Sequence, residues 1–261
     1  MPWVLRGLRD GVVTTGYPKR PDDYAERGVR SVARVRPETV WRKEFRTLCP
    51  TGAISPVADT TQVDQGRCIG CGFCVTAHPE VFEWTPGSAV ARPDRDLLVV
   101  PELPGTELDA VRNRLAERTR GFRRSVHIRH VDAGSDGAVE WEIQALLNPV
   151  YDVHRLGIFF TASPRHADIL LVTGCGSHGM AAPLARTLEA TPRPLVVIAA
   201  GTDAISGGLI CPSYAATGGI GELVPVDVWV PGSPPTPFAL LYAIELAAGR
   251  LGDLRGKEGR R

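Results

Sequence analysis

Residues 167–190 read ADILLVTGCGSHGMAAPLARTLEA, an apolar run that ends in glycine and is followed at once by a helical pattern. The same alternation repeats on both sides. Upstream come the runs VHIRHV and IFFTA around the pattern AVEWEIQALLN, and downstream come PLVVIAAG, VPVDVWVPG and the pattern PFALLYAIELAAG. Apolar runs that alternate with helical patterns predict a parallel sheet covered by helices. We therefore expect a flavodoxin-like α/β domain over residues 125–252.

The loops that follow these strands are the expected place for a site, because an open α/β sheet binds its ligands at the carboxyl ends of the strands. Two cysteines lie on such loops, Cys175 in VTGCGSHGMA and Cys211 in GGLICPSYA. They are candidates for a metal site together with Asp136 and Asp203, although scattered cysteines are more often small buried apolar side chains. The stretch GCGSHG lacks the Lys-Ser/Thr ending of a phosphate-binding loop.

A second informative stretch is RCIGCGFCVTAHPE, residues 67–80, in which Cys68, Cys71 and Cys74 have the spacing C-x2-C-x2-C. This spacing is typical of three ligands of a 4Fe-4S cluster, and in two-cluster ferredoxins the fourth ligand is a remote cysteine that precedes proline. Such a residue is present as Cys49 in LCPTGAI. The sequence therefore predicts one 4Fe-4S cluster held by these four cysteines.

A second cluster is not expected in this part of the chain. Counting back from Cys49 by the same spacing reaches Thr39, Arg42 and Phe45, and His78 stands where the main run would have its last cysteine. All four missing ligands thus belong to one cluster, and all four retained cysteines belong to the other. A structural zinc site is the alternative, although C-x2-C-x2-C places three ligands closer together than zinc ribbons usually do.

Composition limits the partners and the compartment. The chain has 261 residues with 30 basic and 29 acidic side chains, and this balance argues against bulk nucleic acid as a partner. No stretch of 18 or more apolar residues is present, and the start MPWVLRGLRDG lacks the apolar core of a secretory signal. We expect a cytoplasmic protein with no transmembrane span, in which the cysteines serve metal or cluster binding.

The patterns divide the chain into five segments. Residues 1–35 form an amphipathic lead, 36–92 a ferredoxin-like α+β domain, 93–124 a basic helical linker, 125–252 the α/β domain and 253–261 a disordered tail. In the lead, Trp3, Val4, Leu5 and Leu8 share one helix face. That face either packs on the protein or a neighbour, or it lies on a membrane surface.

The N-terminal sequence LRGLRDGVVTTGYPKRPDDYA, together with the cysteine run, resembles the polyferredoxin subunit of membrane-bound nickel-iron hydrogenases of the formate hydrogenlyase type and its counterpart in respiratory complex I. The second half, with HVDAGSDGAVEWEIQALLNP and GELVPVDVWVPGSPP, resembles the small subunit of the same hydrogenases and the homologous cluster-bearing subunit of complex I. The two resemblances cover nearly the whole chain, as expected for a fusion of two adjacent subunits.

The cluster motifs of the resembled α/β subunit are incomplete in this chain. In that family, cysteines in G-S-C-x-x-C-E, G-x-C-A and P-G-C-P-P runs hold the proximal cluster, which lies nearest the large subunit. The corresponding positions here are Asp136, Val139, Asp203 and Ser233. Carboxylate and hydroxyl are harder ligands than thiolate, and valine offers none, so we expect the proximal site to be degenerate.

Two charged residues are retained near these motifs. Glu140 keeps its motif position on the first turn of the predicted helix, and Arg165 is kept in SPRHAD. The resemblance implies for both a place at the interface with the large subunit or on a proton route. The alternative is helix capping and ion pairing at the edge of the sheet.

The resemblance implies an electron-transfer or accessory subunit of a hydrogenase-like or complex I-like oxidoreductase, with no complete catalytic centre on this chain. It implies as partners the large subunit, membrane subunits and a ferredoxin or other electron donor, with the chain peripheral on the inner face of the cell membrane through these partners. Two alternatives stay open. One is a non-redox assembly subunit whose cluster only stabilises the fold. The other is an independent enzyme that uses Asp136, Glu140 and Asp203 with Mg²⁺.

Overall fold

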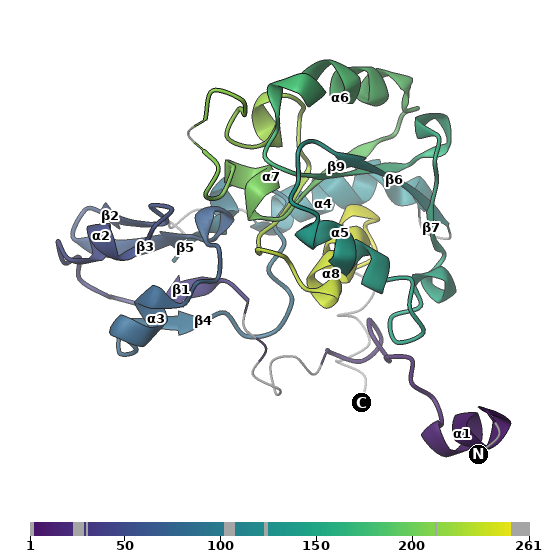
Figure 1. Cartoon of the computed structure of the whole chain (residues 1–261), viewed down its shortest axis with the longest axis horizontal. Helices are drawn as coiled ribbons and strands as arrows, with labels where there is room; N and C mark the ends of the chain where they lie inside the picture. Colours follow the sequence, from purple (N-terminus) through teal and green to yellow (C-terminus); the bar gives the residue numbers. More distant parts are fainter. Residues whose placement is uncertain are drawn as a thin grey trace.

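The structure, a computed structural model, describes residues 3–22, 29, 31–101, 108–122, 125–211 and 213–251. Figure 1 shows an N-terminal unit of small sheets beside a larger α/β unit. The tail predicted for residues 253–261 lies outside the described residues, as do parts of the lead and of the linker.

A five-stranded parallel sheet is the centre of the larger unit. Its strands are β6 (Val126–Asp132), β7 (Ile158–Phe160), β8 (Ile169–Thr173), β9 (Val196–Ala200) and β10 (Val228–Val230). They lie in the order β10-β9-β8-β6-β7, which is the flavodoxin-like order when counted along the chain. Every residue of β8 and β9 is buried, because helices cover both faces of a parallel sheet. The predicted parallel α/β sheet is therefore confirmed.

Helices cover the sheet in two layers. One face packs against α4 (Leu108–Arg118), α5 (Ala138–Ala145) and α8 (Pro237–Ala247), and the other against α6 (His178–Ala190) and α7 (Thr202–Ser206). Short 3-10 turns complete the unit: η3 (Arg120–Phe122), η4 (Val153–Leu156), η5 (Pro164–His166) and η6 (Ile220–Glu222). The basic segment that contains α4 packs on α8, where Arg112 donates a hydrogen bond to the Tyr242 hydroxyl at 2.8 Å.

The start of α8 follows the rules of helix capping. Thr236 is the N-cap residue, and its hydroxyl accepts a hydrogen bond from the Ala239 N–H at 3.2 Å. Pro237 occupies the first helical position, where its missing N–H costs nothing. All but one of the residues in α8 are buried, so this helix is a core element of the unit.

The N-terminal unit contains two small antiparallel sheets. In the first, β1 (Ala33–Val35) pairs with β4 (Phe82–Trp84), and in the second, β3 (Thr60–Asp64) lies between β2 (Ile54–Val57) and β5 (Val99–Val100). Between the strands lie α2 (Phe45–Leu48), η1 (Gln65–Arg67), α3 (Phe73–Ala77) and η2 (Asp96–Leu98). The strand pairing thus extends from Ala33 to Val100, which is wider than the expected range 36–92.

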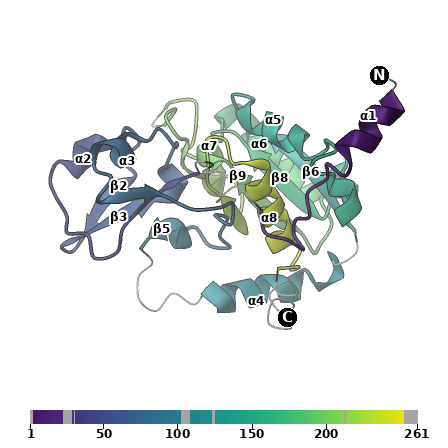
Figure 2. The same cartoon turned by 90° about the horizontal axis from the view of Figure 1, so that it is seen from below.

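The lead begins with α1 (Trp3–Asp10), in which no residue is buried. After this helix the chain is fixed to the α/β unit. The Thr15 N–H donates to the carbonyl of Val150 at 2.8 Å, and the Thr14 hydroxyl donates to the carbonyl of Pro149 at 2.7 Å. Helix α1 therefore extends from the α/β unit, as Figures 1 and 2 both show. No helix in the described ranges is long and apolar enough to cross a membrane.

Candidate functional site

Four cysteines line one pocket in the N-terminal unit. Cys49 follows α2, Cys68 follows η1, Cys71 lies in the next turn and Cys74 lies in α3. Apolar side chains, Leu48 among them, form the rest of the wall. The structure thus brings together the four residues that the cysteine spacing singles out.

Backbone N–H groups already point at two of these sulfur atoms. The Ala33 N–H donates to Cys68 Sγ, and the Ala53 N–H donates to Cys49 Sγ, each at 3.3 Å. Hydrogen bonds to the ligand sulfurs are one of the means by which a protein adjusts the potential of a cluster. The pocket therefore supplies both soft ligands and donors directed at them.

The thiols share a weakly polar environment. Burial, followed by the nearby Cys49 and Cys71, raises the pKa of Cys68. Burial, followed by Cys68, raises the pKa of Cys74 to about 11. Four thiolates in this pocket would be unfavourable without a cation, and a bound cation reverses that balance because ligand thiols give up their protons on binding.

The donor set fits a soft cluster better than a hard ion, because all four donors are sulfur. Among the described residues, no three His, Cys, Asp or Glu side chains meet closely enough for a single metal ion.

The pocket is accessible from one side. Cys71 is exposed and Cys68 is buried, and beside them Phe73 is 60% exposed. A partner protein can thus approach the pocket over Cys71 and Phe73. The opposite side of the pocket, at Cys68, faces the α/β unit.

At the positions where the spacing predicts no second cluster, side chains pack against one another. Phe45 is fully buried, and its ring lies 5.2 Å from the ring of His78 and 5.2 Å from that of Phe82. The Arg42 guanidinium lies over the same ring at 5.6 Å. His78 therefore belongs to a small aromatic core, with its Nδ1 near Glu80 Oε1 at 3.3 Å.

The positions expected for a degenerate proximal cluster lie at one edge of the parallel sheet. Asp136 and Val139 follow β6, Asp203 follows β9 and Ser233 follows β10. This is the carboxyl edge, and the crevice of such a fold lies between β6 and β8, where the strand order reverses. The structure thus places all four on the edge where a ligand of this fold binds.

Protein atoms now occupy part of this edge. Gly201 has a φ of 96°, and a Cβ built on it would lie 2.8 Å from Val139 Cγ2. The Val139 side chain therefore packs directly against the backbone at Gly201. Burial, followed by the charge of Asp136, raises the pKa of Asp203, so this carboxyl takes its neutral form more readily.

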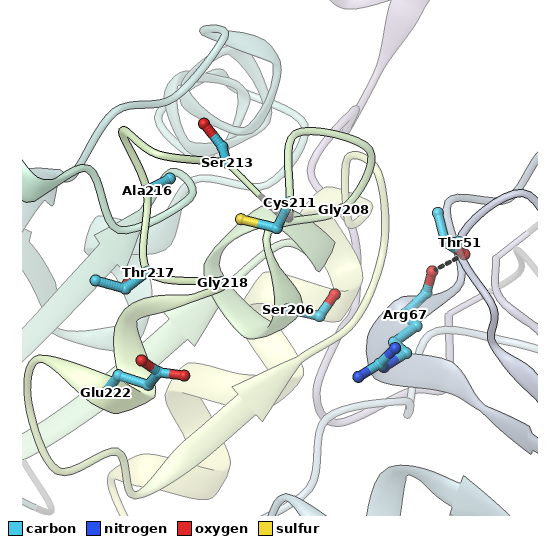
Figure 3. A pocket seen from close by; sticks show the side chains of 10 residues that line it. All are labelled: Thr51, Arg67, Ser206, Gly208, Cys211, Ser213, Ala216, Thr217, Gly218 and Glu222. Carbon is cyan, nitrogen blue, oxygen red and sulfur yellow. Dashed lines mark hydrogen bonds between the residues drawn. The ribbon is translucent and has the colours of Figure 1, made fainter.

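Cys175 and Cys211 lie in different surroundings. Cys175 Sγ donates to the carbonyl of Gly134 at 3.3 Å, and burial, followed by Cys211, raises the pKa of its thiol. Cys211 lines a cavity of about 360 Å³ between the two units (Figure 3). In the wall of that cavity the Thr51 hydroxyl donates to the carbonyl of Arg67 at 2.6 Å, so its proton is used within the protein.

Glu140 and Arg165 lie in separate places. Glu140, on the first turn of α5, accepts a hydrogen bond from the Thr173 hydroxyl, and its Oε1 lies 3.4 Å from His130 Nε2. Burial lowers the pKa of His130 despite this carboxylate. Arg165 is exposed on η5, directly before β8 begins, and therefore lies near the opposite edge of the sheet.

Two hydroxyl groups that no sequence motif singled out connect the cysteine pocket with the carboxyl edge of the sheet. The Thr202 hydroxyl, fully buried in α7, donates to the carbonyl of Cys68 at 2.9 Å and accepts from the Gly232 N–H at 3.3 Å. The Ser206 hydroxyl donates to the carbonyl of Gly66 at 2.9 Å. We call Thr202 and Ser206 the α7 clamp. It holds the Cys68 loop against the carboxyl edge of the sheet.

Replacing Thr202 by Val is expected to lower the free energy of unfolding by about 1–3 kcal/mol, because the change removes the donor to a buried carbonyl and the acceptor of a buried N–H. Equilibrium denaturation would measure the change. Thr202→Ser is the matched control, since it keeps the hydroxyl, and it should lose much less. Equal stability of the two variants would show that the hydrogen bonds of the clamp contribute little.

The fold defines a class: a flavodoxin-like α/β protein joined to a cysteine-rich unit. The chain belongs to the NADH ubiquinone oxidoreductase 20 Kd subunit family, whose model matches residues 137–247. It is 37% identical over 149 residues to the probable membrane-bound hydrogenase subunit mbhJ of Pyrococcus furiosus, covering 57% of this chain and 89% of that protein.

Two further similarities were found. Formate hydrogenlyase subunit 7 of Escherichia coli is 40% identical over 157 residues, which are 60% of this chain, and the chain spans 61% of the length of that relative. A chain of the membrane-bound sulfane sulfur reductase, an archaeal respiratory membrane complex, aligns with a TM-score of 0.45 and 28% identity, covering 53% of this chain and 77% of that chain.

Proposed function

We propose that this chain is an electron-transferring accessory subunit of a membrane-associated complex related to hydrogenases and complex I. In this proposal a ferredoxin-like domain, fused to a family α/β domain, carries one 4Fe-4S cluster on Cys49, Cys68, Cys71 and Cys74. The proximal site at Asp136, Val139, Asp203 and Ser233 is degenerate. The observation that carries the proposal is the single pocket lined by all four cysteines.

A 4Fe-4S cluster, when bound, accepts and releases one electron. The residues of the chain determine what this means here. The four cysteine sulfurs are soft ligands and lie in a pocket with apolar walls. The N–H groups of Ala33 and Ala53 donate to the sulfurs of Cys68 and Cys49 and favour negative charge on them. The exposed side at Cys71 gives a donor such as a ferredoxin a short approach.

The retained α/β domain supports docking to a large subunit as a function separate from electron transfer. The domain has the complete five-stranded sheet, and the α7 clamp joins this sheet to the cysteine pocket. Without ligands at the degenerate site, the route from the pocket to a large subunit lacks its next carrier. The cluster would then exchange electrons with a partner protein that approaches at Cys71, or with a large subunit docked directly against the cysteine pocket.

The partners we propose are a large subunit and membrane subunits, because two relatives are named as subunits of a formate hydrogenlyase and of a membrane-bound hydrogenase. The chain would then lie peripherally on the inner face of the cell membrane.

Iron and acid-labile sulfide, measured on the full chain purified without oxygen, test the proposal. About four irons and four sulfides per chain are expected, together with an EPR signal after dithionite reduction. About eight irons would mean that a second cluster exists and would contradict the degenerate site. Stoichiometric zinc without sulfide would leave only a structural role for the four cysteines.

A non-redox assembly subunit is the second candidate, and the α7 clamp favours it. A cluster on Cys68 would fix the same loop that Thr202 and Ser206 hold, and ligand bonds contribute directly to folding free energy. The two candidates differ in the response to electron donors. Reduction by a physiological ferredoxin on the timescale of turnover supports electron transfer, whereas a cluster that only dithionite reduces supports the assembly role.

A further inference from the structure

We propose that α1 is an interfacial helix that binds the surface of an anionic lipid bilayer directly, with Trp3, Val4, Leu5 and Leu8 in the lipid and Arg6 and Arg9 at the headgroups. The proposal goes beyond attachment through partner subunits, and it concerns residues that the proposed cluster does not touch.

The helix separates its residues completely by polarity. At 100° per residue, Trp3, Gly7, Val4, Leu8 and Leu5 occupy one continuous arc, and the three charged residues occupy the remainder. A sharply amphipathic helix with low overall hydrophobicity is the pattern of a helix that lies in the plane of a membrane interface.

The apolar arc has no partner within the described protein. Trp3 is 84% exposed, Leu8 76%, Leu5 52% and Val4 49%. After the helix, Val12 is also 91% exposed. A contiguous exposed apolar surface of this kind marks an interaction site.

The attachment of the lead determines where this surface points. Beyond Thr14 and Thr15, Tyr17 is buried with its ring 5.4 Å from that of Phe238, and Arg155 donates to the carbonyl of Tyr17 at 2.6 Å. The chain is therefore fixed within a few residues of the helix. Both views show α1 extended away from the two units, so its apolar arc is free to meet an extended surface (Figures 1 and 2).

The charges fit an anionic lipid surface as the occupant, because the polar arc holds two basic residues, Arg6 and Arg9, and one acidic residue, Asp10. Arg6 and Arg9 lie on the polar arc, with Arg9 next to Leu5 at its border, where a guanidinium reaches lipid phosphate while its stem covers apolar surface. Trp3 supplies the aromatic ring that favours the interface. One short helix gives only weak and reversible binding, so the apolar arc and the arginines are both needed.

Flotation of the purified full chain with vesicles tests this proposal. We expect the chain to float with vesicles of phosphatidylcholine and phosphatidylglycerol and much less with phosphatidylcholine alone. The double variant Trp3→Ser, Leu8→Ser should lower the partition coefficient at least about tenfold, because it removes two large side chains from the lipid. Arg6→Gln with Arg9→Gln should weaken binding to the anionic vesicles only.

The matched control is Leu209→Ser with Tyr214→Ser, which removes two exposed large side chains outside α1 and should leave flotation unchanged. A wild-type chain that stays in solution, or a Trp3 and Leu8 variant that floats normally, would overturn the proposal. Flotation only with vesicles that contain partner subunits would also overturn it and assign the helix to a protein. Iron content, measured on the same samples, separates this result from the fate of the cluster proposal.

Discussion

Replacing Cys68 by Ser is expected to reduce the iron of the purified chain from about four atoms to nearly none. Cys68 is the most buried of the four cysteines, and its sulfur is fixed by the Ala33 N–H. Serine offers a harder oxygen on a shorter bond, and the loop cannot move toward iron because the α7 clamp holds its carbonyl. The EPR signal of the reduced protein should be lost together with the iron.

Cys211→Ser is the control for this experiment. Cys211 is also a free cysteine, but it lines the cavity between the units and not the cysteine pocket. Its replacement should leave iron, sulfide and the EPR signal unchanged. An iron content of the Cys68→Ser variant equal to that of the wild-type protein would contradict the assignment of Cys68 as a ligand. Loss of iron from the Cys211 protein would instead implicate that residue as a ligand.

Gly174→Ala is expected to cause a large loss of stability for the addition of a single methyl group. Gly174 follows β8 with a φ of 86°, and a Cβ built on it would lie 2.5 Å from the backbone nitrogen of Ser135 and 2.6 Å from the carbonyl carbon of Gly134. Both contacts are with backbone, so neither can be relieved by turning a side chain. Strained φ and overpacking together suggest a cost of about 3–5 kcal/mol.

Thermal unfolding would show this cost as a fall in Tm of roughly 6–20 °C for a chain of this size. Gly179→Ala is the matched control, because Gly179 lies within α6 and nothing lies within 4 Å of its added Cβ. That variant should be neutral or up to about 1 kcal/mol more stable, since alanine is the better helix former. Similar Tm values for the two variants would show that the loops after β6 and β8 are not closely packed.

Much of the α/β fold could be predicted from the sequence because its signals are local. Each of the five apolar runs became one strand, and the patterns around Ile143, Leu184 and Ile244 became α5, α6 and α8. The cysteine pocket was predictable for a similar reason. The C-x2-C-x2-C spacing within 68–74 predicts three neighbouring cysteines, and Cys-Pro marks the fourth, and all four line one pocket.

Contacts between distant segments gave no such signal. Helix α7 is five residues long, and nothing in TDAIS indicates that Thr202 would bond to the carbonyl of Cys68. Glu140 and Arg165 lie at opposite edges of the sheet. Their sequence motifs do not show at which end of a strand each residue would lie. Polarity could indicate the amphipathic start at Trp3, but only the structure shows that nothing in the described protein covers it.

The α7 clamp has a consequence for the order of events during synthesis. Thr202 follows Cys68 by 134 residues, so at translation rates of about 5–20 residues per second the cysteine loop emerges roughly 7–27 s before its clamp exists. During that interval the Cys68 loop is not yet held by Thr202. Once β9 and α7 have folded, Thr202 fixes the carbonyl of Cys68, while the side of the pocket at Cys71 stays exposed. If the proposed cluster binds here, its insertion into the nascent chain should therefore be faster than into the finished one.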